Sequence, residues 1–211
     1  MFGSLGFRLL TGSGTSTAWH AELDACIRIC RELVRAMNVD IRAGRLEERS
    51  CLLGTMDELN QGVWSLGRRG RPLLQDYELD LESPFEDVAS IAGGVWPVAE
   101  LHRSSADDAI LKLRFAAMTK NLPMHSHEHS DRVIIVIEGQ GTFHVSPDPI
   151  EAYSGAGIRS TPVSEGQVLV FSRGVVHTFE TESDPLLLMS YHAPFIPLED
   201  SRQFEIARSE C

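Results

Sequence analysis

The sequence predicts a mainly β fold, a sandwich or barrel, with a helical extension at its N-terminus. Two observations lead to this expectation. The hydrophobic periodicity changes along the chain from helical spacing to two-residue alternation, and glycines divide the second half into short apolar segments. Between these parts, Gly67 to Pro84 is rich in glycine, proline and acidic residues, which is typical of a connector. We therefore expect an N-terminal helical region at 1–85 and a β domain at 86–211.

The first expected helix covers Ala18 to Met37. Apolar residues recur there at intervals of three and four, which places them on one face of an amphipathic helix. Cys26 and Cys30 lie on this face, one turn apart. We interpret them as core residues rather than metal ligands, because unpaired cysteine packs as a small apolar side chain.

A second helix is predicted after the first. The run Thr55-Met56-Asp57-Glu58 is a capping box, in which the threonine and the glutamate each satisfy a backbone N–H of the first helical turn. We expect this helix to end near Gly62. The helices are expected to pack on the outside of the β domain or at the contact of a homodimer.

The second half is expected to contain short strands. In Leu111 to Phe115, apolar and basic side chains alternate and so point to opposite faces. Glycines such as Gly139 punctuate the segments that follow, and the stretch 147–162 is expected to be a loop. The expected strands are 111–115, 133–137, 142–146, 167–171, 177–181 and 185–191.

Composition excludes two classes of partner. The formal net charge is −11, and long-range repulsion of phosphate disfavours binding to nucleic acid. No apolar stretch approaches the length needed to span a membrane. The four cysteines form no C-x-x-C pair, which is typical of reduced thiols in a reducing compartment. We expect a cytoplasmic protein that binds a small molecule.

The chemistry of the chain is concentrated in residues 123–129, which read PMHSHEH. Side chains two positions apart on a strand share a face, so His125 and His127 can present their imidazoles to one metal ion. His129 is expected at the rim. The other histidines, His102, His144 and His192, are expected to be structural or exposed.

The sequence from about residue 119 to 181 resembles the cupin superfamily. The second motif of that superfamily contains a histidine that follows two glycines at fixed spacing, and Gly166, Gly174 and His177 match it. Ser172 and Thr181 stand where the family usually has a proline and an asparagine. The resemblance implies a double-stranded β-helix, a jelly-roll barrel, in which the strand of His177 faces that of the other two histidines.

The first cupin motif is matched with one departure. His125, His127 and Gly139 fit, but counting back from Gly139 reaches Arg132 where the family has a glutamate ligand. Counting forward from His127 reaches Asp131 instead, with one extra residue that a β-bulge would absorb. Two alternatives remain open. Asp131 is a fourth ligand, or the site has three histidines and Arg132 faces the cavity, where it would bind a carboxylate of a substrate.

The resemblance implies a divalent metal ion bound by His125, His127 and His177, with Fe, Mn, Zn and Ni not distinguished by the sequence. A facial set of ligands leaves coordination positions open. The leading functional hypothesis is a metal-dependent enzyme, dioxygenase-like, acting on a small organic molecule. The alternatives are a metal-free ligand-binding cupin and a non-catalytic sensor that signals through its N-terminal helices, since fold does not determine function.

Overall fold

The computed structural model describes residues 16–55, 86–89, 95–104, 107–115, 122–181 and 185–208. Within these ranges the protein is mainly β, as predicted, with one long helix and a short 3₁₀ helix at Ile150–Ala152. The elements are α1 (Ser16–Arg42), β1 (Cys51–Thr55), β2 (Glu86–Ala89), β3 (Val95–Arg103), β4 (Ala109–Phe115), β5 (His125–Ser126), β6 (Asp131–Glu138), β7 (Gln140–Val145), β8 (Arg159–Ser164), β9 (Gln167–Phe171), β10 (His177–Glu180), β11 (Leu186–Ala193) and β12 (Glu205–Ile206).

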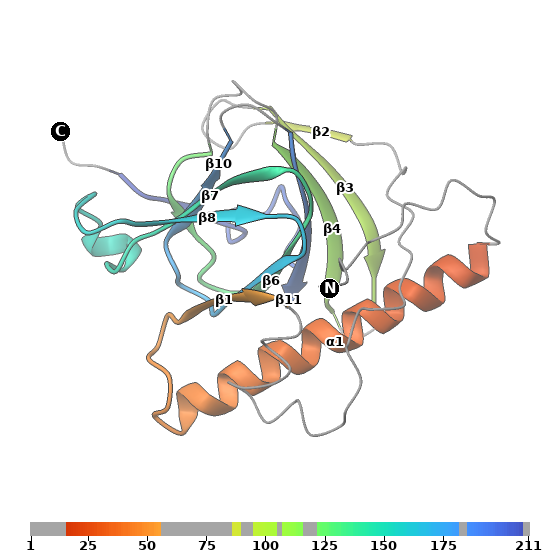
Figure 1. Ribbon diagram of the computed structural model, residues 1–211, viewed down its shortest axis with the longest axis horizontal. Coiled ribbons are helices and arrows are strands. Elements are labelled where there is room, and N and C mark those ends of the chain that lie inside the picture. Colours follow the sequence, from red (N-terminus) through yellow and green to blue (C-terminus); the bar gives the residue numbers. More distant parts are fainter. Residues whose placement is uncertain are drawn as a thin grey trace, which may run out of the picture.

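The described strands form two antiparallel sheets that face each other (Figure 1). The larger sheet has seven strands in the order β1-β9-β6-β11-β4-β3-β2, and the smaller has five in the order β12-β5-β10-β7-β8. Each segment predicted as a strand coincides with one of these, within about two residues at either end, which is the usual uncertainty of strand boundaries. Neighbours in each sheet are often distant in sequence, so the sheets are held together by non-local pairing.

The larger sheet is apolar on both faces, and each face has its own core. Along β6, Val133, Ile135 and Ile137 belong to a core on the outer side, whereas Ile134 and Val136 belong to a core between the two sheets. This division follows from the two-residue alternation of side chains in a strand. It decides which residues of β6 face the interior of the barrel.

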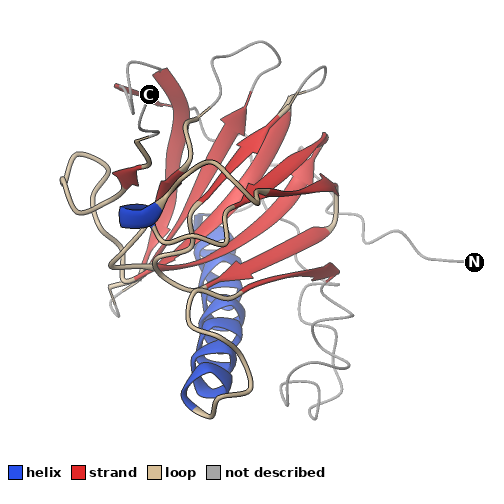
Figure 2. Cartoon of the chain, turned by 90° about the vertical axis from the view of Figure 1, so that its left-hand side faces the viewer, coloured by secondary structure: helices blue, strands red, loops and turns tan. Residues whose placement is uncertain are grey.

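Helix α1 covers the outer face of the larger sheet (Figure 2). Its predicted apolar stripe, which includes Cys26, Cys30 and Met37, is buried against β6, β9 and β11. Arg31 reinforces the contact by an ion pair with the buried Asp108, at 2.8 Å, and Asp108 also accepts a hydrogen bond from the hydroxyl of Tyr191 at 2.7 Å. Both cysteines therefore pack in the core, as interpreted from the sequence.

Several strands lie outside the expected segments: β2, β3 and β12 were not among them, and β1 and β8 lie where a helical region and a loop were expected. β1 pairs along its whole length with β9, so the region before residue 85 contributes a strand to the larger sheet. β8 occupies the end of the stretch expected to be a loop and pairs with β7. Thr55, the expected cap of a second helix, is the last residue of β1, and residues 56–62 lie outside the described part of the chain. The boundary at residue 85 and the homodimer remain predictions.

Gly139 forms the tight turn between β6 and β7 and has a φ of 85°. A Cβ at this position would lie 2.0 Å from the main-chain oxygen of Pro185. Glycine is required here both by the left-handed backbone and by the close approach of the neighbouring chain. The turn fixes the start of β7, which in turn pairs with β10, the strand of His177.

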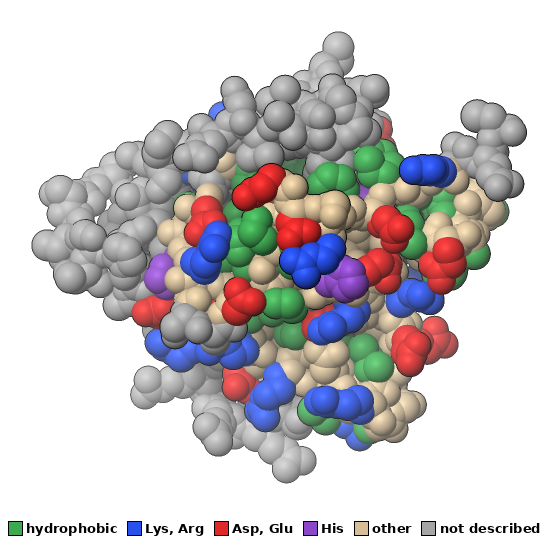
Figure 3. All heavy atoms as spheres, turned by 180° about the vertical axis from the view of Figure 1, so that it is seen from behind, with side chains coloured by type: hydrophobic (Ala, Val, Ile, Leu, Met, Phe, Trp, Pro, Cys, Tyr) green, Lys and Arg blue, Asp and Glu red, His purple; other side chains and the backbone are tan. Residues whose placement is uncertain are grey.

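Acidic and basic side chains are interspersed over the described part of the face opposite to that of Figure 1 (Figure 3). In the described ranges, no helix combines the length and the apolar character that a membrane crossing requires.

Candidate metal centre

Three histidines meet inside the barrel. His125 of β5 and His177 of β10 are direct partners across an antiparallel pair, and His127 lies in the turn that follows β5. Their ring centroids lie 4.5 Å (His125–His177), 5.0 Å (His125–His127) and 5.4 Å (His127–His177) apart. One ring nitrogen from each lies within 4.8 Å of those of the other two. The structure thus brings together the three histidines that the sequence singled out.

Main-chain carbonyls fix the orientation of all three rings. Nδ1 of His125 bonds the oxygen of Pro123 at 2.9 Å, and Nδ1 of His177 bonds that of Val175 at 2.9 Å. Nδ1 of His127 bonds the oxygen of Gln203 at 2.5 Å. A carbonyl oxygen only accepts hydrogen bonds, so each Nδ1 carries the proton and each Nε2 keeps its lone pair. Second-shell bonds of this kind orient histidines for metal binding.

Burial keeps the rings neutral. It lowers the pKa of His125 to about 4, and it lowers the pKa of His127 and of His177 well below the ordinary value. The positive charge of Arg132 lowers the pKa of His127 further, and His125 has this effect on His177. Neutral imidazole is the form that coordinates a metal, so the ligands need to lose no proton at neutral pH.

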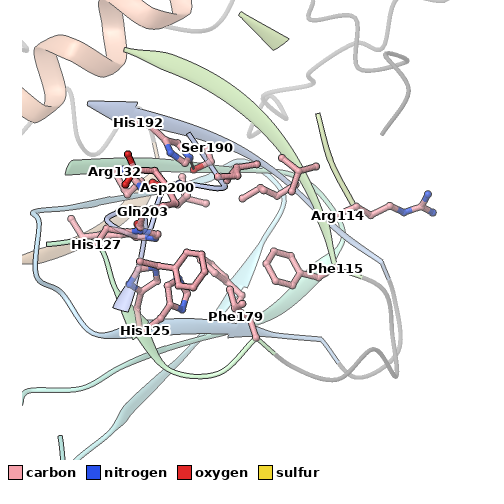
Figure 4. A pocket seen from close by; sticks show the side chains of 18 of the residues that line it. Arg114, Phe115, His125, His127, Arg132, Phe179, Ser190, His192, Asp200 and Gln203 are labelled. Atoms are coloured by element: carbon pink, nitrogen blue, oxygen red, sulfur yellow. Dashed lines mark hydrogen bonds between the residues drawn. The ribbon is translucent and has the colours of Figure 1, made fainter. Parts of the chain in front are cut away.

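The histidines line a cavity of about 300 Å³ between the sheets (Figure 4). The lining is largely apolar and comes from both sheets, with Ile134 and Phe171 on one side and Phe179 on the other. Three neutral nitrogen donors, oriented from one side, fit a divalent ion and leave its other positions facing this cavity.

Asp131 does not join the histidines. Its carboxylate accepts hydrogen bonds from the main-chain N–H of Arg173 at 2.8 Å, from the guanidinium of Arg173 at 3.1 Å and from Asn38 of α1 at 3.1 Å. Asp131 shares the outer face of β6 with Val133, so strand alternation directs it toward the helix. The hypothesis of Asp131 as a fourth ligand is corrected accordingly: the structure has the three-histidine arrangement.

Arg132 points into the cavity, as the alternative register required. Its side chain is 1% exposed and lies on the same face of β6 as Ile134. Its hydrogen bonds go to neutral oxygens: the hydroxyl of Ser130, the main-chain oxygen of Asp131 at 3.3 Å and the side-chain oxygen of Gln203 at 3.4 Å. Burial lowers the pKa of Arg132 to about 9, so the guanidinium is still charged at pH 7.

Comparison with known proteins identifies the barrel. Residues 113–191 match the family model of the cupin domain. The chain therefore contains a cupin domain. No curated protein matches the sequence.

Solved structures with similar folds include three proteins of low sequence identity. A cupin-like protein from Thermotoga maritima has a TM-score of 0.45 and 16% identity, covering 62% of this chain and 90% of its own. A predicted oxalate decarboxylase from the same organism has a TM-score of 0.42 and 18% identity, and the match covers 53% of this chain and 92% of that protein. A protein with a double-stranded β-helix domain from Klebsiella pneumoniae has a TM-score of 0.40 and 18% identity, and the match covers 58% of this chain and 91% of that protein.

The cupin cavity also contains polar residues that the sequence analysis did not select. His192, expected to be structural or exposed, lines the cavity together with Ser190, and its Nε2 lies 2.8 Å from the Ser190 hydroxyl. Gln203 is buried and contacts both His127 and Arg132. Ser190 and His192 could have been found as a polar pair at two-residue spacing in an apolar strand. No comparable pattern in the sequence marks Gln203 as a residue of the cavity. His129 is exposed, as expected of a rim residue.

Proposed function

We propose that this cupin binds a divalent ion through His125, His127 and His177 and acts as a metal-dependent oxidoreductase, dioxygenase-like, on a small organic molecule. The observation that supports the proposal is the shared orientation of the three rings. Each Nδ1 is bonded to a main-chain carbonyl, which leaves the three Nε2 atoms available to an ion on one side of the cavity. This arrangement requires no carboxylate ligand.

When bound, a divalent ion would supply open coordination positions and Lewis-acid or redox chemistry beside the cavity. The side chains around the cavity would contribute in two other ways. The apolar lining excludes water from the cavity, and Arg132 provides a fixed positive charge at its wall. In a dioxygenation both atoms of O₂ end in the organic product, so no further reductant is consumed.

The proposal is tested with protein purified without a metal-affinity tag. Elemental analysis is expected to find close to one equivalent of Fe, Mn, Zn or Ni per chain. Oxygen uptake is then measured with an electrode in the presence of a set of small organic acids, with protein stripped by a chelator as the control. Absence of any bound metal from the folded protein would contradict the proposal.

The alternative function is a sensor barrel without catalysis. It is favoured by one contact: Asn38 of α1 bonds Asp131, whose neighbour Arg132 lines the cavity. A ligand at Arg132 could therefore alter the packing of α1. Metal binding without oxygen uptake, together with a ligand-dependent change in protease cleavage within α1, would favour this function over the enzyme.

A further inference from the structure

The buried Arg132 has no acidic partner in the part of the chain that the structure describes. Its guanidinium has five N–H donors, and the hydrogen bonds given above use the two terminal nitrogens only. Nε donates to no described residue. Burying a cation without a counter-charge is costly, and proteins usually pair such a charge or use it to bind a ligand.

The nearby acids form no ion pair with Arg132, although the charge of Asp131 offsets part of the lowering of its pKa by burial. The carboxylate of Asp131, one residue away, lies on the opposite face of β6 and is bonded to Arg173. Glu199 and Asp200 line the mouth of the cavity, and Asp200 is paired with Arg202 at 2.7 Å. A divalent ion on three neutral histidines would add two further positive charges. The cavity is therefore suited to an anion.

A second unsatisfied group lies next to Arg132. His192 is its direct partner across the β11–β6 pair, and both residues line the cavity. Nδ1 of His192 is buried and has no hydrogen-bond partner among the described residues. In the tautomer in which the Ser190 hydroxyl donates to Nε2, Nδ1 carries a proton that has no acceptor among the described residues. In Figure 4, His192, Ser190 and Arg132 lie together at one wall, with His127 near them.

The remainder of the cavity is apolar, which restricts the rest of the ligand. At roughly 30 Å³ per water molecule, a volume of about 300 Å³ corresponds to a ligand of about ten non-hydrogen atoms. An inorganic anion would leave this apolar surface uncovered. The apolar side chains that line it include Val98, Leu113, Phe115, Leu122, Ile134 and Phe179.

We propose that Arg132 and His192 form an anion subsite and that the ligand of this cupin is a small monocarboxylic acid with an apolar body. Arg132 holds the carboxylate by paired N–H donors, and Nδ1 of His192 donates to one of its oxygens. The apolar body lies against the aromatic side of the cavity, near the histidine cluster. The inference deepens the proposed function, because it names the class of molecule on which the site acts.

The test compares acids with their neutral amides. Propionate, isovalerate and benzoate, each paired with its primary amide, are titrated into the full-length protein by isothermal calorimetry. We expect at least one acid to bind ten times more tightly than its amide or better. If none of the three acids is preferred to its amide, or if inorganic phosphate binds as tightly as the best acid, the monocarboxylate assignment is wrong.

Variants then assign the preference to the two residues. In Arg132→Met the affinity for the preferred acid is expected to fall to within twofold of the affinity for its amide. In His192→Phe the affinity for the acid is expected to fall at least threefold. Arg159→Met is the matched control: Arg159 is exposed on β8 and is not among the residues that line the cavity, so the preference is expected to remain. Unchanged affinity in either Arg132→Met or His192→Phe, with circular dichroism like that of the parent, contradicts the subsite.

The titrations are made on both metal-free and metal-loaded protein, which separates this inference from the proposed function. A preference for the acid that persists without metal supports Arg132 and His192 as the subsite, even if no metal binds. A preference that appears only after loading means that the ion itself holds the carboxylate, and it overturns the subsite while leaving the metal centre intact.

Discussion

His125 and His177 are direct partners across the antiparallel pair of β5 and β10, with ring centroids 4.5 Å apart. This is the only residue pair that the described register gives for those two strands, so the pairing and the histidine cluster share the same residues. Because each ring is also held by a main-chain carbonyl, the cluster is organised by folding of the barrel.

Replacing one ligand by an aromatic isostere should remove metal binding and leave the fold intact. His177 packs with its ring centroid 4.4 Å from that of Phe171 and 5.9 Å from that of Phe143, so a phenylalanine ring suits its surroundings. We expect His177→Phe to lower metal affinity by more than about 100-fold, beyond the typical effect of changing a residue that only orients a ligand. Elemental analysis measures the metal, and circular dichroism measures the fold.

The matched control for this prediction is His144→Phe. His144 lies on β7, where it bonds Ser160 at 2.9 Å and Glu180 at 3.0 Å, outside the cluster. This variant should keep the metal content of the parent. Full metal content in folded His177→Phe would rule out the centre as described.

The sequence predicted most of the strands that pair around the cavity but missed others, and β1 and β8 were missed for physical reasons. β1 is short, and only its pairing with the distant β9 makes it a strand, so local propensity does not reveal it. β8 contains Pro162, which counts against a strand in sequence analysis. It lies at the edge of the smaller sheet, where proline is tolerated.

The choice between Asp131 and Arg132 could not be made from the sequence. Both faces of β6 are apolar, because α1 covers the outer face and the inner face lines the barrel. The alternation of side chains along the strand therefore did not indicate which of the two residues faces the cavity. Only the position of Ile134 in the inner core shows that Arg132 faces the cavity and Asp131 the helix.

Asp131 is expected to matter for stability rather than for metal binding. In Asp131→Asn the charge-assisted bonds to Arg173 are lost, which should lower the free energy of unfolding by about 1–3 kcal/mol. Arg173→Met should cost more, because it leaves a buried carboxylate without its cation. Urea unfolding of metal-free protein measures both. Mn(II) titration should give the affinity of the parent for Asp131→Asn, and a clear loss would restore Asp131 as a ligand.

The contact of α1 with the barrel should depend on its apolar stripe. Leu33 is fully buried in the core beneath the helix, so Leu33→Ala should lower the free energy of unfolding by about 2–5 kcal/mol. Val39 lies on the same helix with 44% of its surface exposed, and Val39→Ala should change the free energy of unfolding by less than about 0.5 kcal/mol. Equal effects of the two changes in chemical denaturation would mean that α1 does not pack on the sheet as described.

The metal-free protein should lose stability as pH falls from about 6.5 to about 4. The pKa of His125 is lowered to about 4 by burial, whereas a histidine in the unfolded chain has a pKa near 6.5. Between these values the unfolded state binds the proton and the folded state does not, so stability rises with pH and is complete above about 6.5. His125 alone accounts for about 3 kcal/mol across this window. His127 and His177, whose pKa values are also lowered, act in the same direction.

The buried carboxylate of Asp108 does not contribute to the pH dependence between about pH 4 and 6.5. Although burial raises it, the pKa of Asp108 is lowered overall by hydrogen bonds from Ser104, Tyr191 and Arg31, so its contribution is lost only below about pH 4. Urea unfolding at pH 5 and pH 7, in the presence of a chelator, is the measurement. His177→Phe removes one of the buried imidazoles and should show a smaller difference between the two pH values than the parent does. Parent protein that is equally stable at both would mean that the histidine rings are hydrated rather than buried in the barrel.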